Sequence, residues 1–273
     1  MNESLMHKPK SHFHSRVSEE MSEHLDKPTW SVRQKLALTA RILARQDHGS
    51  GLAGQITARG EEPGTMWTGR FGLGLEELRA SDFLLVDEDL NVIKGEGMAN
   101  PANRFHLWVY RARKDVEAIV HTHPPYASAL AMIGVPLIAS HMDTAMFYDD
   151  CAFLEHWPGP PIGDDEGELI AAALGGKRAI LLAHHGQLCA GGSVQEAAVL
   201  AYHFEVAARI QLLAMAAGEI RALDPACAKD AHDYRLKPAV LDATFLYQAR
   251  LILGRGETDC LEEEGGSFQP TKK

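Results

Sequence analysis

An apolar run that ends in two histidines and two prolines is the feature of this sequence that most constrains its fold. Residues 118–125 read AIVHTHPP. The β-branched and apolar residues favour a buried strand, and the prolines end it. Because side chains alternate across a strand, His121 and His123 lie on the same face of the sheet. The sequence therefore predicts a sheet that presents two imidazoles side by side, close enough to bind one metal ion.

A second apolar run has the same design. Residues 179–186 read AILLAHHG, a predicted strand that ends in two histidines and a glycine. If the two strand ends meet in space, three histidines can surround one cation and leave coordination positions open. That arrangement is typical of catalytic rather than structural metal sites.

The composition fits one large globular domain. The chain has 273 residues, 45% of them hydrophobic, which is enough for a sizeable core. Its net charge of −10 argues against nucleic acid and anionic membrane surfaces as partners. We find no apolar run of transmembrane length and no signal-peptide pattern. The four cysteines form no CxxC pair, so we expect free thiols and a cytoplasmic protein that acts on a small molecule.

Helical and strand patterns are mixed along the chain. This mixture, with several hairpin-like pairs, predicts a three-layer α/β domain around a mostly antiparallel or mixed sheet. Residues 147–161 read as irregular. We divide the chain into an N-terminal extension (1–29), one domain (30–253) and an acidic mobile tail (254–273). The expected strands are 55–59, 66–70, 83–87, 92–94, 116–122, 135–139, 180–184 and 187–189, and the expected helices are 31–45, 104–112, 126–133, 165–174, 193–215 and 238–253.

The motifs between residues 30 and 253 occur in an order that resembles the class II aldolase/adducin family. The matching pieces are GQITAR at 54–59, ASDFLLVD at 80–87, HLWVY at 106–110, ARKDV at 112–116, HTH at 121–123 and HG at 185–186. The resemblance implies an α/β/α sandwich and a homotetrameric ring with active sites between neighbouring subunits. It also implies that His121, His123 and His185 hold a divalent metal, first of all zinc, with Fe²⁺ or Mn²⁺ as alternatives.

One departure from the family concerns proton transfer. The family's aldolases carry a Pro-Ser-Ser-Glu stretch whose carboxylate is the acid/base, whereas residues 100–106 here read NPANRFH. Ala102 stands at the carboxylate position, and a methyl group cannot transfer a proton. The remaining catalytic candidates are Asn103 beside that position, Glu96 as the nearest acidic residue, and Tyr148, which lies where the family's neighbouring-subunit tyrosine would come from.

A second departure concerns phosphate binding. Gln55 stands where the family has an asparagine, and the loop that ends at Gly74 lacks the hydroxyl groups that would cradle a phosphate. We expect Gln55 and Gly74 to contact the substrate, together with His141, which follows the predicted strand 135–139. These differences favour a small non-phosphorylated keto acid, aromatic carboxylate or phenol over a sugar phosphate.

The sequence thus predicts a metal-dependent lyase that performs aldol-type cleavage or decarboxylation through a metal-stabilised enolate. Two alternatives stay open. One is a non-haem iron oxygenase of aromatic 2-oxo or 2-hydroxy acids, which resembles family members of the aminocoumarin-antibiotic pathway type. The other is a non-enzymatic, adducin-like interaction module, which the presence of all three candidate ligands disfavours.

Overall fold

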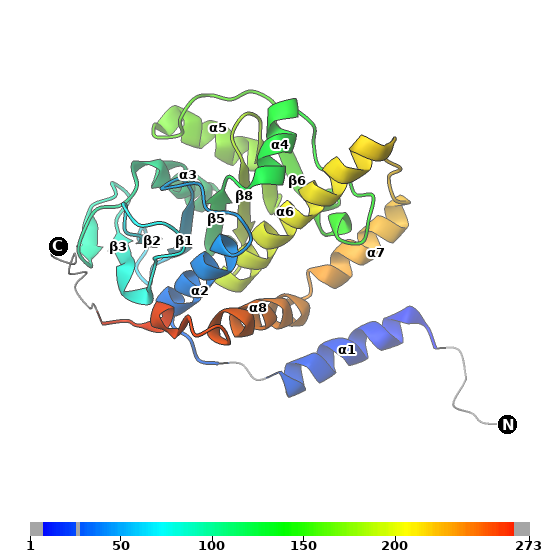
Figure 1. The fold of residues 1–273 in the computed structure, drawn as a ribbon, viewed down its shortest axis with the longest axis horizontal. Coiled ribbons are helices and arrows are strands. Elements are labelled where there is room, and N and C mark those ends of the chain that lie inside the picture. Colours follow the sequence, from blue (N-terminus) through cyan, green and yellow to red (C-terminus); the bar gives the residue numbers. More distant parts are fainter. Residues whose placement is uncertain (1–7, 26–27, 265–273) are drawn as a thin grey trace.

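An eight-stranded sheet forms the centre of the fold in the computed structural model, which describes residues 8–25 and 28–264 (Figure 1). The strand order is β4-β3-β2-β1-β5-β8-β7-β6. All neighbours are antiparallel except β6 and β7, which are parallel. The strands are β1 (Gln55–Arg59), β2 (Met66–Gly69), β3 (Phe83–Val86), β4 (Val92–Lys94), β5 (Ala118–Thr122), β6 (Cys151–Leu154), β7 (Ala179–Leu182) and β8 (Gln187–Gly191).

Helices cover both faces of the sheet, which confirms the predicted three-layer α/β architecture. One face packs against α2, α4, α6 and α8 through one buried core, and the other packs against α3 and α5 through a second core. Figure 1 also shows α1 lying outside these layers, beside α7 and α8. The helices are α1 (Lys10–His24), α2 (Val32–Ala44), α3 (Arg104–Ala112), α4 (Pro125–Ile133), α5 (Asp164–Leu174), α6 (Val194–Ala217), α7 (Pro225–Arg235) and α8 (Pro238–Leu253).

The strand that carries the His-x-His motif lies in the middle of the sheet. All five residues of β5 are buried, and the strand pairs with β1 on one side and β8 on the other. Ile119 belongs to the core beneath α3 and α5, whereas Val120 belongs to the core beneath α2 and α6. Because side chains alternate, His121 projects toward the α3 side together with Ile119.

Helix α6 has the length and apolar composition that could cross a membrane, the only such helix among the described residues. Half of that apolar window is buried inside the structure, where α6 packs against β5, β8 and α8. The fold itself therefore explains the apolar character of this helix, since a central core helix has the same composition.

The predicted strand at 135–139 is wrong. These residues form neither helix nor strand, and their backbone groups bond to partners outside the sheet. The amide of Ile138 donates to the Gln211 side chain at 2.7 Å, and the carbonyl of Ala139 accepts from the Leu223 amide at 2.9 Å. A helix side chain and a distant loop thus replace the neighbouring strand that the pattern implied.

Three helices or strands are absent from the predicted set. The first is α1, which lies within the predicted N-terminal extension. Residues 147–161 contain β6, a half-buried edge strand that pairs in parallel with β7. Helix α7 begins after Asp224, whose carboxylate accepts from the amides of Ala226 and Cys227, and Pro225 occupies its first turn. An Asp-Pro pair at that position is a helix-start signal that the sequence does carry.

The segment after α8 differs from the expected mobile tail. Residues 257–262 pack against α2 and the short 3₁₀ helix Ala80–Asp82, and Cys260 is fully buried. Arg41 makes ion pairs with Glu257 at 3.6 Å and Asp259 at 2.9 Å. The acidic residues of this segment therefore act as anchors, while residues 265–273 of the predicted tail lie outside the described part of the chain.

Candidate metal centre

Three histidines from two chain segments meet at one point of the sheet. The ligand nitrogens of His121, His123 and His185 all lie within 4.8 Å of one another. Their ring centroids are 4.5–4.8 Å apart in each pair. His121 is buried, and the other two are partly exposed. The two strand ends identified in the sequence therefore converge, and the group opens toward solvent on the side of His123 and His185.

Hydrogen bonding fixes the orientation of His121. Its Nδ1–H donates to the backbone carbonyl of Gln187 in β8 at 2.8 Å. The ring of Phe105 packs edge-on against it, with centroids 5.0 Å apart. Because Nδ1 carries the hydrogen, the Nε2 lone pair points at the other two imidazoles, which is the orientation that a metal ligand needs.

A tight turn brings His185 into the group. Strand β7 ends at Leu182, and the Leu182 amide bonds back to the Gly186 carbonyl at 2.8 Å. His184 adopts a left-handed backbone with φ 57° and exposes its side chain. A Cβ at Gly186 would lie 2.6 Å from the Thr122 carbonyl oxygen and 2.7 Å from the His123 ring. The His-Gly pair is therefore a packing requirement of the site.

The three imidazoles are held in the neutral state. Burial lowers the pKa of His121 well below its ordinary value, and the neighbouring His185 and His123 lower it further. Burial also lowers the pKa of His123, and it lowers that of His185 to about 4. Neutral imidazole is the form that coordinates metals.

The donor set fits a divalent transition metal. The Nε2 atoms of His121 and His123 lie 2.9 Å apart, close to the separation of about 3.3 Å that two nitrogens have on a tetrahedral zinc with ordinary bond lengths. Two facing nitrogens share at most one hydrogen, whereas a cation satisfies all three lone pairs. No carboxylate belongs to the group among the residues that the structure describes. Imidazole donors suit zinc and iron better than magnesium or calcium.

A buried polar layer lies beside the histidines under α3. Gln55 is the strand partner of His121 and shares its face of the sheet. Thr57, two residues along β1, bonds to His106 Nδ1 at 2.8 Å and to the Tyr110 hydroxyl at 2.9 Å. Burial lowers the pKa of His106 to about 3, so this ring is neutral as well. His106 therefore bridges α3 and β1 and does not belong to the metal group.

Asn103 lies in the same layer. It is fully buried, and its Nδ2 donates to Thr68 in β2 at 2.8 Å. Its Oδ1 finds no partner among the described residues, and neither do Gln55 Oε1 and His106 Nε2. A buried polar atom without a partner is costly, so these three atoms are suited to receive a ligand. Thr57 and Thr68 belong to this polar layer, and the sequence analysis did not predict them. The pairing of β1 with β2, which places the two threonines side by side, could have indicated them.

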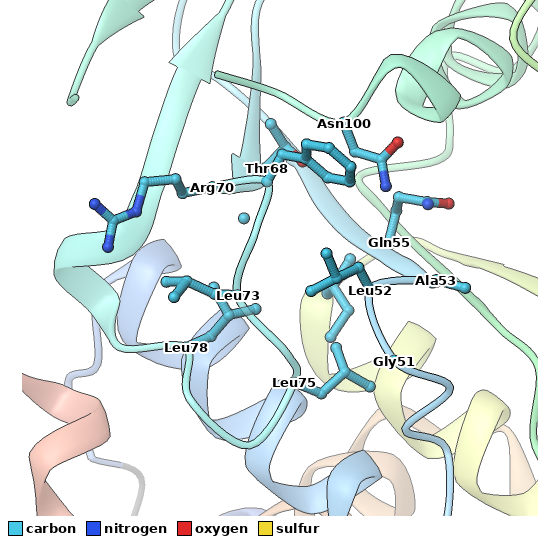
Figure 2. A pocket seen from close by; sticks show the side chains of 14 residues that line it. Gly51, Leu52, Ala53, Gln55, Thr68, Arg70, Leu73, Leu75, Leu78 and Asn100 are labelled. Carbon is cyan, nitrogen blue, oxygen red and sulfur yellow. The ribbon is translucent and has the colours of Figure 1, made fainter. Parts of the chain in front are cut away.

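A small hollow adjoins this layer at the β1–β2 end of the sheet. Figure 2 shows the polar ends of Gln55 and Asn100 together on one side and leucine side chains on the other. Arg70 contributes to the wall, but its guanidinium pairs with Asp82 at 2.8 Å. The remaining lining is mostly apolar: Leu52, Ile56, Phe71, Leu73, Leu75 and Leu78, with the backbone of 51–54 and Gly69 and with Thr68.

The other predicted site residues lie apart from the three histidines or meet them only indirectly. Gly74 is buried between two lining leucines, and its amide donates to the Glu77 carboxylate at 2.8 Å. Glu96 and His141 are exposed, and His141 faces Asp143 at 3.5 Å. Tyr148 is half-buried after a 3₁₀ turn. No hydrogen bond or ion pair joins these four residues to the histidines within residues 8–25 and 28–264, and their roles stay predictions.

Comparison with known proteins agrees with this fold. The model of the "Class II Aldolase and Adducin N-terminal domain" family matches residues 34–212. The chain belongs to this family. A solved L-fuculose 1-phosphate aldolase from Glaciozyma antarctica PI12 superposes with a TM-score of 0.79 at 26% identity, covering 90% of this chain and 99% of that one.

Two Streptomyces relatives are more similar in sequence. The decarboxylase NovR of Streptomyces niveus is 32% identical over 66% of this chain and 67% of its own length. A protein of Streptomyces roseochromogenus subsp. oscitans, named 4-hydroxy-3-prenylphenylpyruvate oxygenase/4-hydroxy-3-prenylbenzoate synthase, is also 32% identical, over 66% of this chain and 65% of its own. The match thus spans about two thirds of each relative. The family therefore includes members named for aldol cleavage, decarboxylation and oxygenation.

Proposed function

We propose that this protein is a metal-dependent carbon–carbon lyase that acts on a small non-phosphorylated hydroxy, keto or aromatic acid. The observation that carries the proposal is the convergence of three neutral imidazoles, to which no carboxylate of residues 8–25 or 28–264 is added. His121, His123 and His185 would hold a divalent cation, zinc in the first place. The open side of the group faces solvent and leaves room for a substrate.

A bound divalent cation supplies Lewis acidity, which polarises a carbonyl or carboxylate oxygen and stabilises negative charge there. The chain itself supplies orientation. Gln55 Oε1 and Asn103 Oδ1 are buried acceptors beside the histidines, and each can accept a hydrogen bond from a substrate hydroxyl. A side-chain amide neither gains nor loses a proton near neutral pH, so Asn103 would position the substrate and would not act as an acid or base.

Decarboxylation suits this site better than aldol cleavage. In decarboxylation the bond between the carboxyl carbon and its neighbour breaks, its electron pair moves toward the adjacent carbonyl, and the carbon later takes up one proton. No protein base has to remove a proton from the substrate first. Aldol cleavage needs such a base, and the family's carboxylate position holds Ala102 here.

The hollow at Gln55 supports a substrate without phosphate. A phosphate dianion is held by free cations, hydroxyls or clustered amides. Arg70 is the cationic side chain that the described residues contribute to the lining, and Asp82 already neutralises it. The Thr68 hydroxyl is engaged by Asn103. Leucines and Phe71 form most of the remaining wall, which favours an apolar or aromatic substituent.

A second candidate is an iron-dependent oxygenase of aromatic 2-oxo or 2-hydroxy acids. The relative from Streptomyces roseochromogenus subsp. oscitans, named as an oxygenase, favours it at 32% identity. Three imidazoles can hold Fe²⁺, although two histidines and one carboxylate form the commoner iron site. The identity of the metal therefore separates the two candidates.

The test begins with protein purified without added metal and analysed for bound Zn, Fe and Mn. Oxaloacetate, a β-keto acid whose loss of CO₂ leaves an enolate, is then assayed for CO₂ release, and L-fuculose 1-phosphate for aldehyde formation. Phenylpyruvate and mandelate, which lose CO₂ by oxidation, are assayed for oxygen uptake. We expect bound zinc and turnover of a non-phosphorylated acid without oxygen uptake. Iron with oxygen uptake would favour the second candidate. Preferential cleavage of the sugar phosphate, or full activity in a metal-free protein, would refute the lyase proposal.

We further propose a homotetramer with active sites at subunit interfaces, in the cytoplasm. Large apolar side chains at the ends of α4 and α6 support an interface: Met132, Ile133 and Leu213 are 54–70% exposed. The four cysteines are free thiols, as expected in a reducing compartment. Sedimentation that shows only monomer would refute the tetramer.

A further inference from the structure

Gln187 contacts both faces of the sheet at the metal centre. Its backbone carbonyl accepts the Nδ1–H of His121 on the α3 side at 2.8 Å. Its fully buried side chain extends to the α6 side, where Nε2 donates to Thr122 Oγ1 at 3.2 Å and to the Ala201 carbonyl at 3.1 Å. One residue thus connects the orientation of a candidate ligand with a polar group on the opposite face.

The polar group on the α6 side is closed to solvent. Thr122 lies between the two histidines of the motif and is the strand partner of Gln187, in the last pair of the β5–β8 ladder. Its hydroxyl also bonds to His48 Nδ1 at 2.9 Å. His48, Thr122 and Gln187 are all fully buried. This far-face cluster, defined by those three residues, joins the α2–β1 loop, β5, β8 and α6.

The position of Gln187 explains why the cluster matters. It is the first residue of β8 and follows the turn at Gly186 directly. On the β7 side Gln187 pairs with Leu181, but on the β5 side the pair with Thr122 is the last one, and a ladder frays at its end. The side-chain bonds to Thr122 and Ala201 replace the missing pair. They therefore hold the carbonyl that sets the ring orientation and tautomer of His121.

We propose that Gln187, supported by Thr122, is a positioning residue of the metal centre, acting on His121 from the opposite face of the sheet. This inference rests on the proposed metal site. Partners that orient a metal-bound histidine tune affinity by about 10- to 100-fold in other metalloproteins. Here that control passes through a main-chain carbonyl, so the side chain that matters touches neither the metal nor the substrate.

The test compares Gln187→Met with Gln211→Met in the full-length protein. Gln211 is an equally buried glutamine on α6 that makes two bonds of the same kind, to the Ile138 amide at 2.7 Å and the Pro136 carbonyl at 2.8 Å. Co²⁺ serves as the probe. Its affinity is measured by competition with a chelator, its absorption spectrum reports ligand geometry, and the Tm of the metal-free protein reports stability.

We expect Gln187→Met to weaken Co²⁺ binding by about 10- to 100-fold and to change the absorption spectrum. Gln187→Met and Gln211→Met should lower the Tm of the metal-free protein by similar amounts. Gln211→Met should leave the Co²⁺ affinity and the absorption spectrum unchanged. Thr122→Val should behave as Gln187→Met does, and Thr122→Ser, which keeps the hydroxyl, should restore wild-type affinity. If Gln187→Met does not fold, the comparison of Thr122→Val with Thr122→Ser tests the same proposal.

Two negative results have different meanings. If Gln187→Met and Thr122→Val bind Co²⁺ within twofold of the wild type, the positioning role is refuted and the metal site stands. If the wild-type protein itself binds no Co²⁺ or Zn²⁺, the proposed metal centre fails, and this inference fails with it.

Discussion

Histidines in two regions of this protein have opposite electrostatic surroundings. One region is the cluster of three histidines at the sheet, and the other, here called the charged group, is His232 with Asp150, Arg178, Lys229 and Asp233. His121, His123 and His185 face one another, and burial lowers the pKa of each. His232 in α7 instead bonds to Asp150 at 3.1 Å and to Asp233 at 2.9 Å. The hydrogen bond to Asp150 raises its pKa above the ordinary value. A histidine among histidines favours its neutral form, which offers a lone pair, whereas a histidine between carboxylates has its charged form stabilised and joins elements of the fold.

The carboxylate at the centre of the second group makes the contrast clear. Asp150 is buried and accepts from the Arg178 amide at 2.9 Å, the Arg178 guanidinium at 2.7 Å and His232. It ties α7 to the β6–β7 edge of the sheet. Histidine thus forms the proposed metal site in one region and supports tertiary structure in the other, and each role can be tested by substitution.

The largest expected effect is on metal binding. His185→Ala removes one of three donors, so Zn²⁺ affinity should fall by at least about 100-fold, beyond the usual effect of losing an outer-shell partner. Titration against a chelator measures it. His184→Asn is the matched control, because that neighbouring side chain is exposed and asparagine tolerates the left-handed backbone, so Zn²⁺ affinity should stay at the wild-type value. Equal affinity in His185→Ala and wild type would remove His185 from the site.

The next effect is on stability in the charged group. Asp150→Asn keeps the shape but removes the charge that Arg178 and His232 face. We expect the free energy of unfolding to fall by about 2 kcal/mol, measured by urea denaturation. Zn²⁺ affinity should stay at the wild-type value. A loss of metal binding in this variant would show that the two regions are coupled, contrary to the comparison.

The charged group should also make stability depend on pH. The pKa of His232 is raised on folding, so its contribution is fully present below its unfolded value of about 6.5 and is lost as pH rises through the folded value. The pKa of Asp150 is lowered, so that carboxylate stays charged over this range. The Tm difference between wild type and His232→Gln should therefore be largest at about pH 5.5 and shrink toward about pH 9. A difference that grows with pH would contradict the assignment.

The smallest effect is expected at the surface of the same group. Lys229 pairs with Asp233, and their side chains are 67% and 52% exposed. Lys229→Ala should change the free energy of unfolding by no more than about 0.5 kcal/mol, again by urea denaturation. A clearly larger loss would mean that the charged group depends on its exposed rim as well as on Asp150.

The sequence predicted the strands and the ligands where local patterns carry the information. Alternation on β5 placed His121 and His123 on one face, and the apolar run of β7 predicted a second strand end. The route of His185 into the group was not predictable from alternation. It depends on the left-handed backbone of His184 and the close approach of Gly186 to β5. Such contacts come from tertiary structure and leave no periodic pattern.

The missing elements have a similar cause. Edge strand β6 is short, and all of its residues are half-buried, so they show no alternation of apolar and polar side chains. Its partner β7 also lies well along the chain, so no hairpin pattern marks the pair. Residues 135–139 do carry a strand-like pattern, but Gln211 supplies the hydrogen bond that a neighbouring strand would give. Gln187 was likewise invisible as a site residue, because its contact with His121 is made by a carbonyl that every residue possesses.

The docked C-terminal segment sets a limit on how the chain can be shortened. Arg41 is 7% exposed on α2 and faces Glu257 and Asp259. A version truncated after α8 would leave that guanidinium buried with only backbone carbonyls of Glu77 and Leu78 as partners. An uncompensated buried cation is strongly destabilising. A purification tag therefore belongs beyond Glu264, and the acidic turn before it should be treated as part of the folded domain.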